Sequence, residues 1–164
     1  MKKFHPYPFA RAISASPRLD LTARISAPSG WIDLNYSPYR LEASTFGERS
    51  VSWRKREVSS EFVEGTFVVS AVRENVTETL AVWVKGESEF DLQTNLDKLC
   101  GALEQLSYRL MQRHGNSAVY YDCTVADYTV TESREFKHAG IALVRASVPR
   151  HPQAEHVYAA VDER

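Results

Sequence analysis

The 164-residue chain contains few cysteines and few glycines, and both shortages argue against whole classes of protein. Cys100 and Cys123 are too few for a disulfide framework, and they do not form a CxxC motif. We interpret both as buried free thiols and keep a redox pair as the less favoured alternative. Only seven glycines are present, and no glycine-rich phosphate-binding motif occurs. The sequence therefore gives no sign of a nucleotide-binding loop.

Signatures of common catalytic and metal sites are also missing. The chain contains no GxSxG, HExxH or DxDxDG pattern. Its five histidines are scattered: His5, His114, His138, His151 and His156. We therefore expect no metal, no cofactor and no enzymatic activity, although a catalytic triad can be built from residues that are distant in sequence.

Charge and hydrophobicity narrow the choice of partners. The chain has 20 Lys plus Arg and 21 Asp plus Glu, so it has no overall attraction to nucleic acid or to an anionic membrane. No apolar run approaches the roughly 18 to 20 residues of a membrane span. The N-terminus, which starts with Lys2, Lys3 and two early prolines, does not resemble a signal peptide. The sequence predicts a protein that is made and kept in a cytoplasm.

Residues 1–28 are predicted to form an extended N-terminal arm. Five of the seven prolines lie in the first 38 residues, where they restrict regular structure. The arm carries five basic side chains and one acidic side chain. Two interpretations stay open. The segment either lies on another surface, with one short strand near residues 19–25, or it is a frayed terminus.

Short apolar segments bounded by Gly, Ser or Pro predict several β-strands after the arm. The first three cover residues 31–34, 39–45 and 51–58. Residues 66–72 and 76–84 are rich in β-branched side chains, and we expect them to pair as a hairpin around a turn at residues 73–75.

Two more strands are predicted near the C-terminus. Residues 118–125 alternate apolar side chains, and a bulge is expected near Ala126 and Asp127. Residues 141–148 are apolar at nearly every position, so we expect a strand that is covered on both faces or that lies in an interface. Pro149 and Pro152 are expected to end this strand, which leaves residues 151–164 as a C-terminal tail.

Residues 91–114 are predicted to form one amphipathic helix. Asp91 is the expected N-cap, and Gly115 with Asn116 provides the stop. Six leucines follow one another at spacings of four and three residues: Leu92, Leu96, Leu99, Leu103, Leu106 and Leu110. This stripe favours a helix packed on a sheet over a short coiled coil. The predicted fold is a single α+β domain over residues 29–150, mainly an antiparallel β-sandwich or barrel-like sheets with one flanking helix.

A basic and aromatic segment surrounds Trp53. Arg54, Lys55 and Arg56 follow it directly, and such a mixture can contact a polyanion. Because Glu48 and Glu57 flank the segment, a charged strand edge that resists aggregation is the simpler interpretation.

The stretch WRKREVSSEFVEGTFVVSAVRENVTETLAVWVKG (residues 53–86), the segment DLQTNLDKLCGALEQL and the closing strands together resemble minor tail proteins of long-tailed, siphovirus-type bacteriophages, especially those of actinobacteria. The resemblance covers residues 31–150 and includes no catalytic signature. It implies a fold similar to that of tail-tube proteins and of the distal tail protein, whose subunits join edge to edge into hexameric rings.

The resemblance implies a non-enzymatic virion protein that forms a ring, expected to be hexameric, at the distal tail or tail tip, continues the DNA-conducting tube and docks tip proteins. Its expected partners are further copies of itself and the tube, tape-measure and tip or baseplate proteins, with only transient passage of DNA and no membrane. The alternatives are a major tail tube or tail terminator protein and, from another class, a small cytoplasmic ligand-binding module or enzyme. The last would need a pocket near His138, Arg145 or Tyr128.

Candidate interface residues follow from the same implication, because a ring completes its strand edges with neighbouring subunits. The expected oligomer interface consists of Trp53, Arg54, Arg56, Phe67, Val69, Val82 and Trp83. The N-terminal arm is expected to reach an adjacent ring through Phe4, Tyr7 and Phe9.

Overall fold

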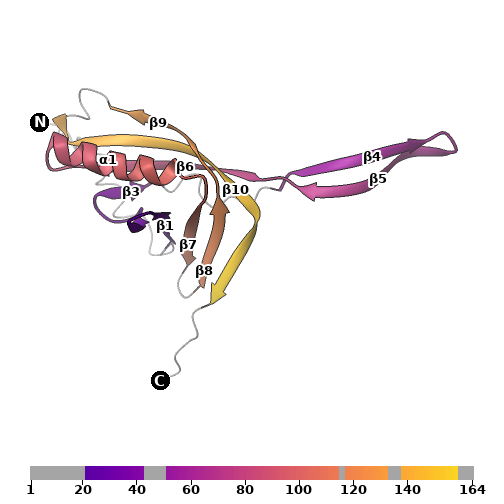
Figure 1. Ribbon diagram of the computed structural model, residues 1–164, viewed down its shortest axis with the longest axis horizontal. Coiled ribbons are helices and arrows are strands. Elements are labelled where there is room, and N and C mark those ends of the chain that lie inside the picture. The colour runs from indigo at the N-terminus through magenta and orange to yellow at the C-terminus, as the bar shows by residue number, and fades with distance from the viewer. Residues whose placement is uncertain (1–20, 43–50, 115–116, 133–137, 159–164) are drawn as a thin grey trace, which may run out of the picture.

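The computed structural model describes residues 21–42, 51–114, 117–132 and 138–158. These residues form a large antiparallel sheet with one helix packed on it, and a separate two-stranded sheet that extends away from this body (Figure 1). The predicted fold class, mainly antiparallel and barrel-like sheet with one flanking helix, is confirmed.

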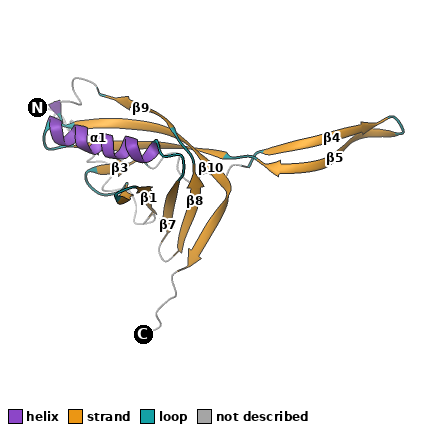
Figure 2. Ribbon diagram, viewed as in Figure 1, coloured by secondary structure: helices purple, strands orange, loops and turns teal. Residues whose placement is uncertain are grey.

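Ten strands and one helix make up the described chain (Figure 2). In chain order they are β1 (Leu21–Ala27), β2 (Gly30–Asp33), β3 (Tyr39–Leu41), β4 (Trp53–Ser60), β5 (Val63–Arg73), β6 (Val76–Lys85), α1 (Glu89–Leu103), β7 (Tyr108–His114), β8 (Ser117–Cys123), β9 (Asp127–Thr131) and β10 (Ile141–Tyr158). The large sheet has the strand order β2-β1-β7-β8-β10-β6-β3, and β9 also pairs with β10. Among the described residues, strands β4 and β5 pair only with each other.

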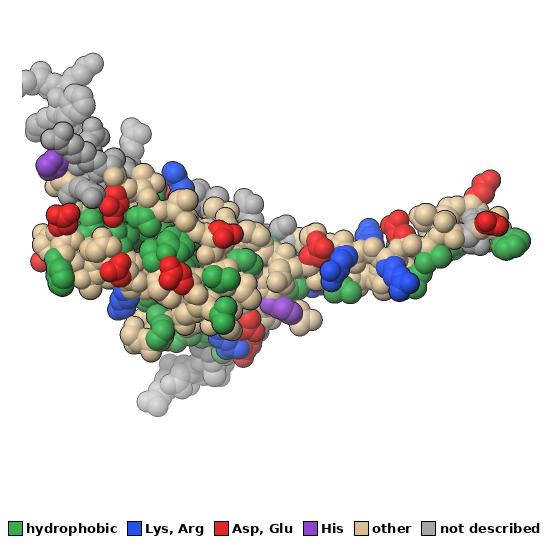
Figure 3. All heavy atoms as spheres, turned by 45° about the horizontal axis from the view of Figure 1, so that its top comes forward, with side chains coloured by type: hydrophobic (Ala, Val, Ile, Leu, Met, Phe, Trp, Pro, Cys, Tyr) green, Lys and Arg blue, Asp and Glu red, His purple; other side chains and the backbone are tan. Residues whose placement is uncertain are grey.

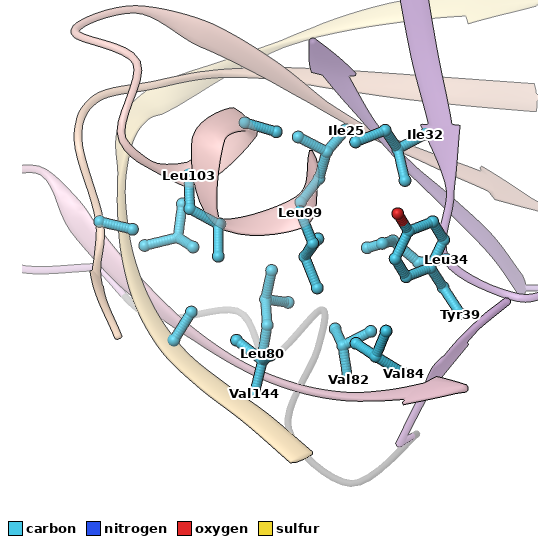
Figure 4. Close-up of a cluster of buried hydrophobic side chains, with 14 of the residues drawn as sticks. Ile25, Ile32, Leu34, Tyr39, Leu80, Val82, Val84, Leu99, Leu103 and Val144 are labelled. Atoms are coloured by element: carbon cyan, nitrogen blue, oxygen red, sulfur yellow. The ribbon is translucent and has the colours of Figure 1, made fainter. Parts of the chain in front are cut away.

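The core lies between α1 and the face of the sheet that α1 covers. Four leucines of α1 are buried there: Leu92, Leu96, Leu99 and Leu103. Figure 4 shows Leu99 close to Leu80 and Val82 of β6. Ser88 is the N-cap, because its hydroxyl accepts a hydrogen bond from the Asp91 amide at 3.1 Å. The expectation that Asp91 caps the helix is therefore wrong by one turn.

The helix is shorter than the leucine pattern predicts, since it ends at Leu103 and not near residue 114. Leu106 lies in the following turn and is 85% exposed, whereas Leu110 is buried from strand β7. Strand β7 forms ladders with both β1 and β8, and these pairings outweigh the local helical period. Leu110 continues the spacing of the helical leucines, but its side chain enters the same core from strand β7 and not from the helix.

Residues 66–72 and 76–84 are both strands, but they do not pair with each other as predicted. Strand β5 pairs with β4, while β6 pairs with β10 and β3. The chain reverses instead at Glu61 and Phe62, which form the turn between β4 and β5. Because neither residue is a typical turn former, local sequence signals favoured the wrong partner.

Strand β10 is longer than predicted and joins two parts of the sheet. It pairs with β6 from Ile141 to Arg150. It pairs with β8 at Arg150 and, after a shift in register, from Ala154 to Tyr158. The carbonyl of Pro149 accepts a hydrogen bond from the Thr124 amide, beyond the end of β8. In an antiparallel strand, the backbone nitrogen and the carbonyl oxygen of one residue face the same neighbouring strand. The nitrogen of Pro149 therefore also faces the region beyond the end of β8, where the ladder needs no N–H donor, so β10 can contain this proline. The predicted stop at Pro149 and Pro152, and the tail from residue 151, are therefore wrong up to Tyr158.

Three smaller expectations are corrected as well. The short strand expected near residues 19–25 is present as β1, but Ala23 and Ile25 are completely buried in the core, so the extended arm does not continue to residue 28; residues 1–20 lie outside the described residues. The predicted bulge near residue 126 is a break between β8 and β9. Both cysteines are free, but Cys100 is only partly buried, whereas Cys123 is buried.

We predict that Leu99→Ala lowers the free energy of unfolding by about 2 to 5 kcal/mol, because it leaves a cavity under the helix. Leu106→Ala is the matched control, since it removes the same atoms from an exposed leucine, and it should change stability by less than about 0.5 kcal/mol. Denaturant unfolding followed by circular dichroism measures both. Equal losses from the two variants would contradict the placement of the helix end.

Candidate assembly surface

The most unusual feature of the structure is the β4–β5 ribbon, residues 53–73, which extends from the body as two strands without a third (Figure 1). Its ladder runs from the Trp53–Arg73 pair to the Ser60–Val63 pair next to the turn. Both outer edges are open among the described residues, and every described side chain of the ribbon is exposed. Isolated two-stranded hairpins are only marginally stable in water, so this ribbon needs contacts beyond its own pairing.

Large hydrophobic side chains are exposed along the ribbon. Seven of them are between 45% and 95% exposed: Trp53, Val58, Phe62, Phe67, Val68, Val69 and Val72. Figure 3 shows hydrophobic atoms along this extension up to its tip. Exposed apolar side chains in such number are typical of a surface that binds another protein.

A bulge in β5 sets the position of Val69. The register passes from Arg56 opposite Ser70 to Glu57 opposite Val68, so Val69 has no partner residue on β4. Its side chain is 62% exposed. Bulges turn side chains out of the regular alternation of a strand, and here the bulge leaves one more apolar side chain exposed.

Charge is distributed unevenly along the ribbon. Arg54, Lys55 and Arg56 lie in the half of the ribbon nearer the body, Glu57 follows them in the middle of β4, and Glu61 and Glu64 lie near the turn; Figure 3 shows acidic atoms at the tip of the extension. Near the body, the Arg73 guanidinium also stacks over the Trp53 ring at 5.2 Å from its centroid. The excess of basic side chains toward the body and of acidic ones at the tip favours one docking direction on a surface of complementary charge.

The structure separates the predicted interface residues into two groups. Trp53, Arg54, Arg56, Phe67 and Val69 all lie on the ribbon. The other two lie on β6 in the body, where Trp83 is partly exposed and Val82 is only 3% exposed within the core. The prediction that Val82 contacts a partner is therefore wrong. Phe4, Tyr7 and Phe9 lie outside the described residues.

A buried ion pair lies on the strand that follows the ribbon. Arg150 Nε of β10 is 2.7 Å from Glu78 Oε1 of β6, and the two side chains are only 8% and 5% exposed. The Arg150 guanidinium also lies 4.4 Å from the centroid of the Tyr121 ring. The pair thus joins β6, two residues after the start of that strand, to β10 at the point where β10 changes register on β8.

A second candidate surface lies between α1 and β9 and is called the acidic groove here. It has a volume of about 760 Å³ and is lined by Gln93, Leu96, Asp97, Cys100, Gly101, Glu104, Tyr128, Val130 and Glu132. The Tyr128 hydroxyl donates a hydrogen bond to Glu104, and this bond, with a smaller contribution from burial, raises the pKa of Tyr128. Burial raises the pKa of the Cys100 thiol, so Cys100 stays protonated near neutral pH.

The residues proposed for a ligand pocket do not converge. Tyr128 and Arg145 line a hollow of about 230 Å³, which is smaller than the roughly 300 Å³ at which small-molecule pockets begin. Tyr128 also lines the larger acidic groove, but Arg145 and His138 do not. His138 is exposed and is not one of its lining residues. Within the described ranges, no three potential metal-ligating side chains gather, and no helix is both long and apolar enough to cross a membrane.

The sequence matches no protein-family model and no curated protein. Solved structures with a similar fold do exist. A chain of the phage P2 baseplate in its activated conformation with Ca aligns with a TM-score of 0.57 and 14% identity over 80% of this chain and 44% of that one. A chain of the same baseplate with Sr gives 0.57 and 11%, over 79% and 43%. The SPP1 Dit protein, described as a paradigm of the hub adsorption apparatus in phages that infect Gram-positive bacteria, gives 0.53 and 12%, over 82% and 51%.

This chain therefore has the fold of phage baseplate and hub proteins, and it spans about half or less of the length of those chains. The expectation of a phage-tail fold is confirmed at this level. Its narrower part, a minor tail protein of an actinobacteriophage, stays a prediction.

We predict that Glu78→Gln lowers the free energy of unfolding by about 3 kcal/mol, because it leaves the buried Arg150 guanidinium without a counter-charge. The control is Asp122→Asn, which removes the carboxylate from the exposed Arg109–Asp122 pair and should cost less than about 1 kcal/mol. Guanidinium unfolding at one protein concentration compares them. If Glu78→Gln lowers the free energy of unfolding no more than the control does, the ion pair does not stabilise the contact between β6 and β10.

Proposed function

We propose that this chain is a structural subunit of a phage tail that assembles with further copies into a ring near the distal end of the tail. One observation carries the proposal: a fold found in phage baseplate and hub proteins bears a ribbon whose hydrophobic side chains no part of the described subunit covers. The role is mechanical and needs no cofactor. Similarity to baseplate and Dit chains favours the distal position over a major tube or terminator role.

In the proposed assembly the ribbon of one copy docks on the body of the next. Trp53, Phe67 and Val69 are the hydrophobic contacts, and Arg54 and Arg56 set the direction. A strand edge is open on the body: residues 154–158 of β10 pair with β8 on one side, and no described strand pairs with them on the other. A ribbon strand added to this edge would gain main-chain hydrogen bonds that it lacks in the isolated subunit.

A contact between the ribbon of one copy and the body of another is heterologous, because the two surfaces differ. Contacts of this kind generate closed rings when the rotation between copies closes, and open filaments when it does not. The resemblance to tail proteins favours a ring of six. The near-neutral charge of the chain suits a channel for DNA, since many phosphate contacts would hold the passing genome.

We predict that Val69→Asp abolishes assembly and leaves a folded subunit, because it places a charge on the exposed apolar part of the ribbon. Size-exclusion chromatography with light scattering measures the mass, and circular dichroism measures the fold. Wild type should give particles of about six subunits, visible as rings in negative stain, and the variant should give monomers.

Val125→Asp is the matched control, since Val125 is 48% exposed on the body and the chemical change is identical. It should assemble like wild type. A wild-type chain that remains monomeric at all concentrations, or a Val69→Asp variant that still forms rings, would contradict the proposed use of the ribbon.

A further inference from the structure

A connected cluster of side chains lies on the face of the large sheet that points away from the core, and it is called the outer patch here. Its members are Trp31, Arg109, Tyr120, Asp122, Glu155 and Val157. Arg109 lies between the buried residues Tyr108 and Leu110, so its side chain points to the opposite face of the sheet. Asp122 is opposite Arg109 in the β7–β8 ladder, and Glu155 is opposite Tyr120 in the β8–β10 ladder, so these side chains share that face.

Arg109 links the charged members of the outer patch. Its Nε is 3.0 Å from Asp122 Oδ1, and its Nη2 is 3.0 Å from Glu155 Oε2. The guanidinium also lies 5.9 Å from the centroid of the Tyr120 ring. The Asp122 and Glu155 side chains are 68% and 56% exposed, so a second cation can reach them. Because two carboxylates share one guanidinium, this cluster has an excess of negative charge.

Apolar groups lie beside these carboxylates. The Trp31 ring packs edge-on against the Tyr120 ring, with the centroids 6.1 Å apart, and Trp31 remains nearly half exposed. Val157 lies two residues after Glu155 on β10 and is exposed to a similar degree. It belongs to residues 154–158, whose outer strand edge is open among the described residues. A surface of this kind suits a partner that combines apolar and basic side chains on one face.

One face of the ribbon has the complementary chemistry. Alternate residues of β4 share a face, and the β4–β5 register places Phe67 opposite Val58 and Val72 opposite Arg54. This face consists of Arg54, Arg56, Val58, Phe67, Ser70 and Val72, and none of the six is acidic. Val58, Phe67 and Val72 are each about half exposed. The other face carries Glu57 next to Lys55 and Arg73, so it matches an acidic surface less well.

From this complementarity we infer that the outer patch of one copy binds the Arg54–Phe67 face of the ribbon of a neighbouring copy. The inference rests on the assembly proposed above and names the surface of the body that receives the ribbon. The two arginines of the ribbon approach Asp122 and Glu155, and its apolar side chains cover Trp31 and Val157. The ribbon of the same copy extends away from the body, so the contact joins different copies (Figure 1).

Two substitutions of Val157 test the charge of the contact at one exposed position. Val157→Arg places a cation in front of the basic ribbon face, so it should raise the protein concentration needed for half-assembly at least about tenfold. Val157→Asp removes the same apolar group but adds the favourable charge, so it should raise that concentration less. Light scattering measures assembly, and circular dichroism checks the fold. Val125→Arg is the control, because Val125 is also about half exposed but lies outside the patch, and it should assemble like wild type.

Mixing two defective chains tests whether the patch and the ribbon bind each other. Phe67→Asp damages the ribbon face and leaves the patch intact, whereas Val157→Arg does the reverse. Each variant should be monomeric alone. Their mixture should form a one-to-one dimer, because the intact ribbon of one chain meets the intact patch of the other and no further interface is available. Native mass spectrometry identifies which chains the dimer contains.

These results separate the inference from the proposed function. If Val157→Arg forms rings like wild type, if Val157→Asp is the more harmful substitution, or if the mixture stays monomeric, the outer patch is not the receiving surface. Ring assembly by the wild-type chain would still stand in each of these cases. A wild-type chain that is monomeric at all concentrations would contradict both proposals.

Discussion

The buried ion pair between Arg150 and Glu78 is the constraint on which the arrangement of the molecule depends. Both charges lie inside the sheet, where each would be costly alone, so β6 and β10 must meet at this register. Arg150 also lies at the point on β10 where the part paired with β6 ends. The register shift on β8 follows directly, between Arg150 and Ala154. Because β6 follows the ribbon after two residues, the pair also fixes where the ribbon leaves the body.

The structure divides into a body that stabilises itself and a ribbon that does not. Leucines of α1 and valines of β6 and β10 bury a continuous core, whereas the ribbon buries none of its described side chains. This division suits a subunit that folds first and assembles second. In the proposed assembly a partner stabilises the ribbon and covers a strand edge that would otherwise favour aggregation.

The sequence predicted most strands and the fold class, because alternation and β-branched residues are local signals. It did not predict which strands pair, because pairing depends on contacts between distant residues. Val69 and Val82 illustrate the difference: both are valines in predicted strands, yet one lies on an exposed bulge and the other in the core. The sequence singled out the basic and aromatic segment from Trp53 to Arg56, which lies on the ribbon, and its role in an interface stays a prediction. The groove was missed, since Asp97, Tyr128 and Glu132 are separated in sequence and meet only in the fold.

Amide hydrogen exchange of β4 and β5, measured across protein concentrations, tests the central claim that a second copy completes the ribbon. Exchange reports local opening, and an isolated hairpin opens readily. The account predicts fast exchange in dilute monomers and strong protection of residues 53–73 once assemblies form, while α1 is protected in both states. Ribbon amides that exchange at the same rate in monomers and assemblies would contradict it.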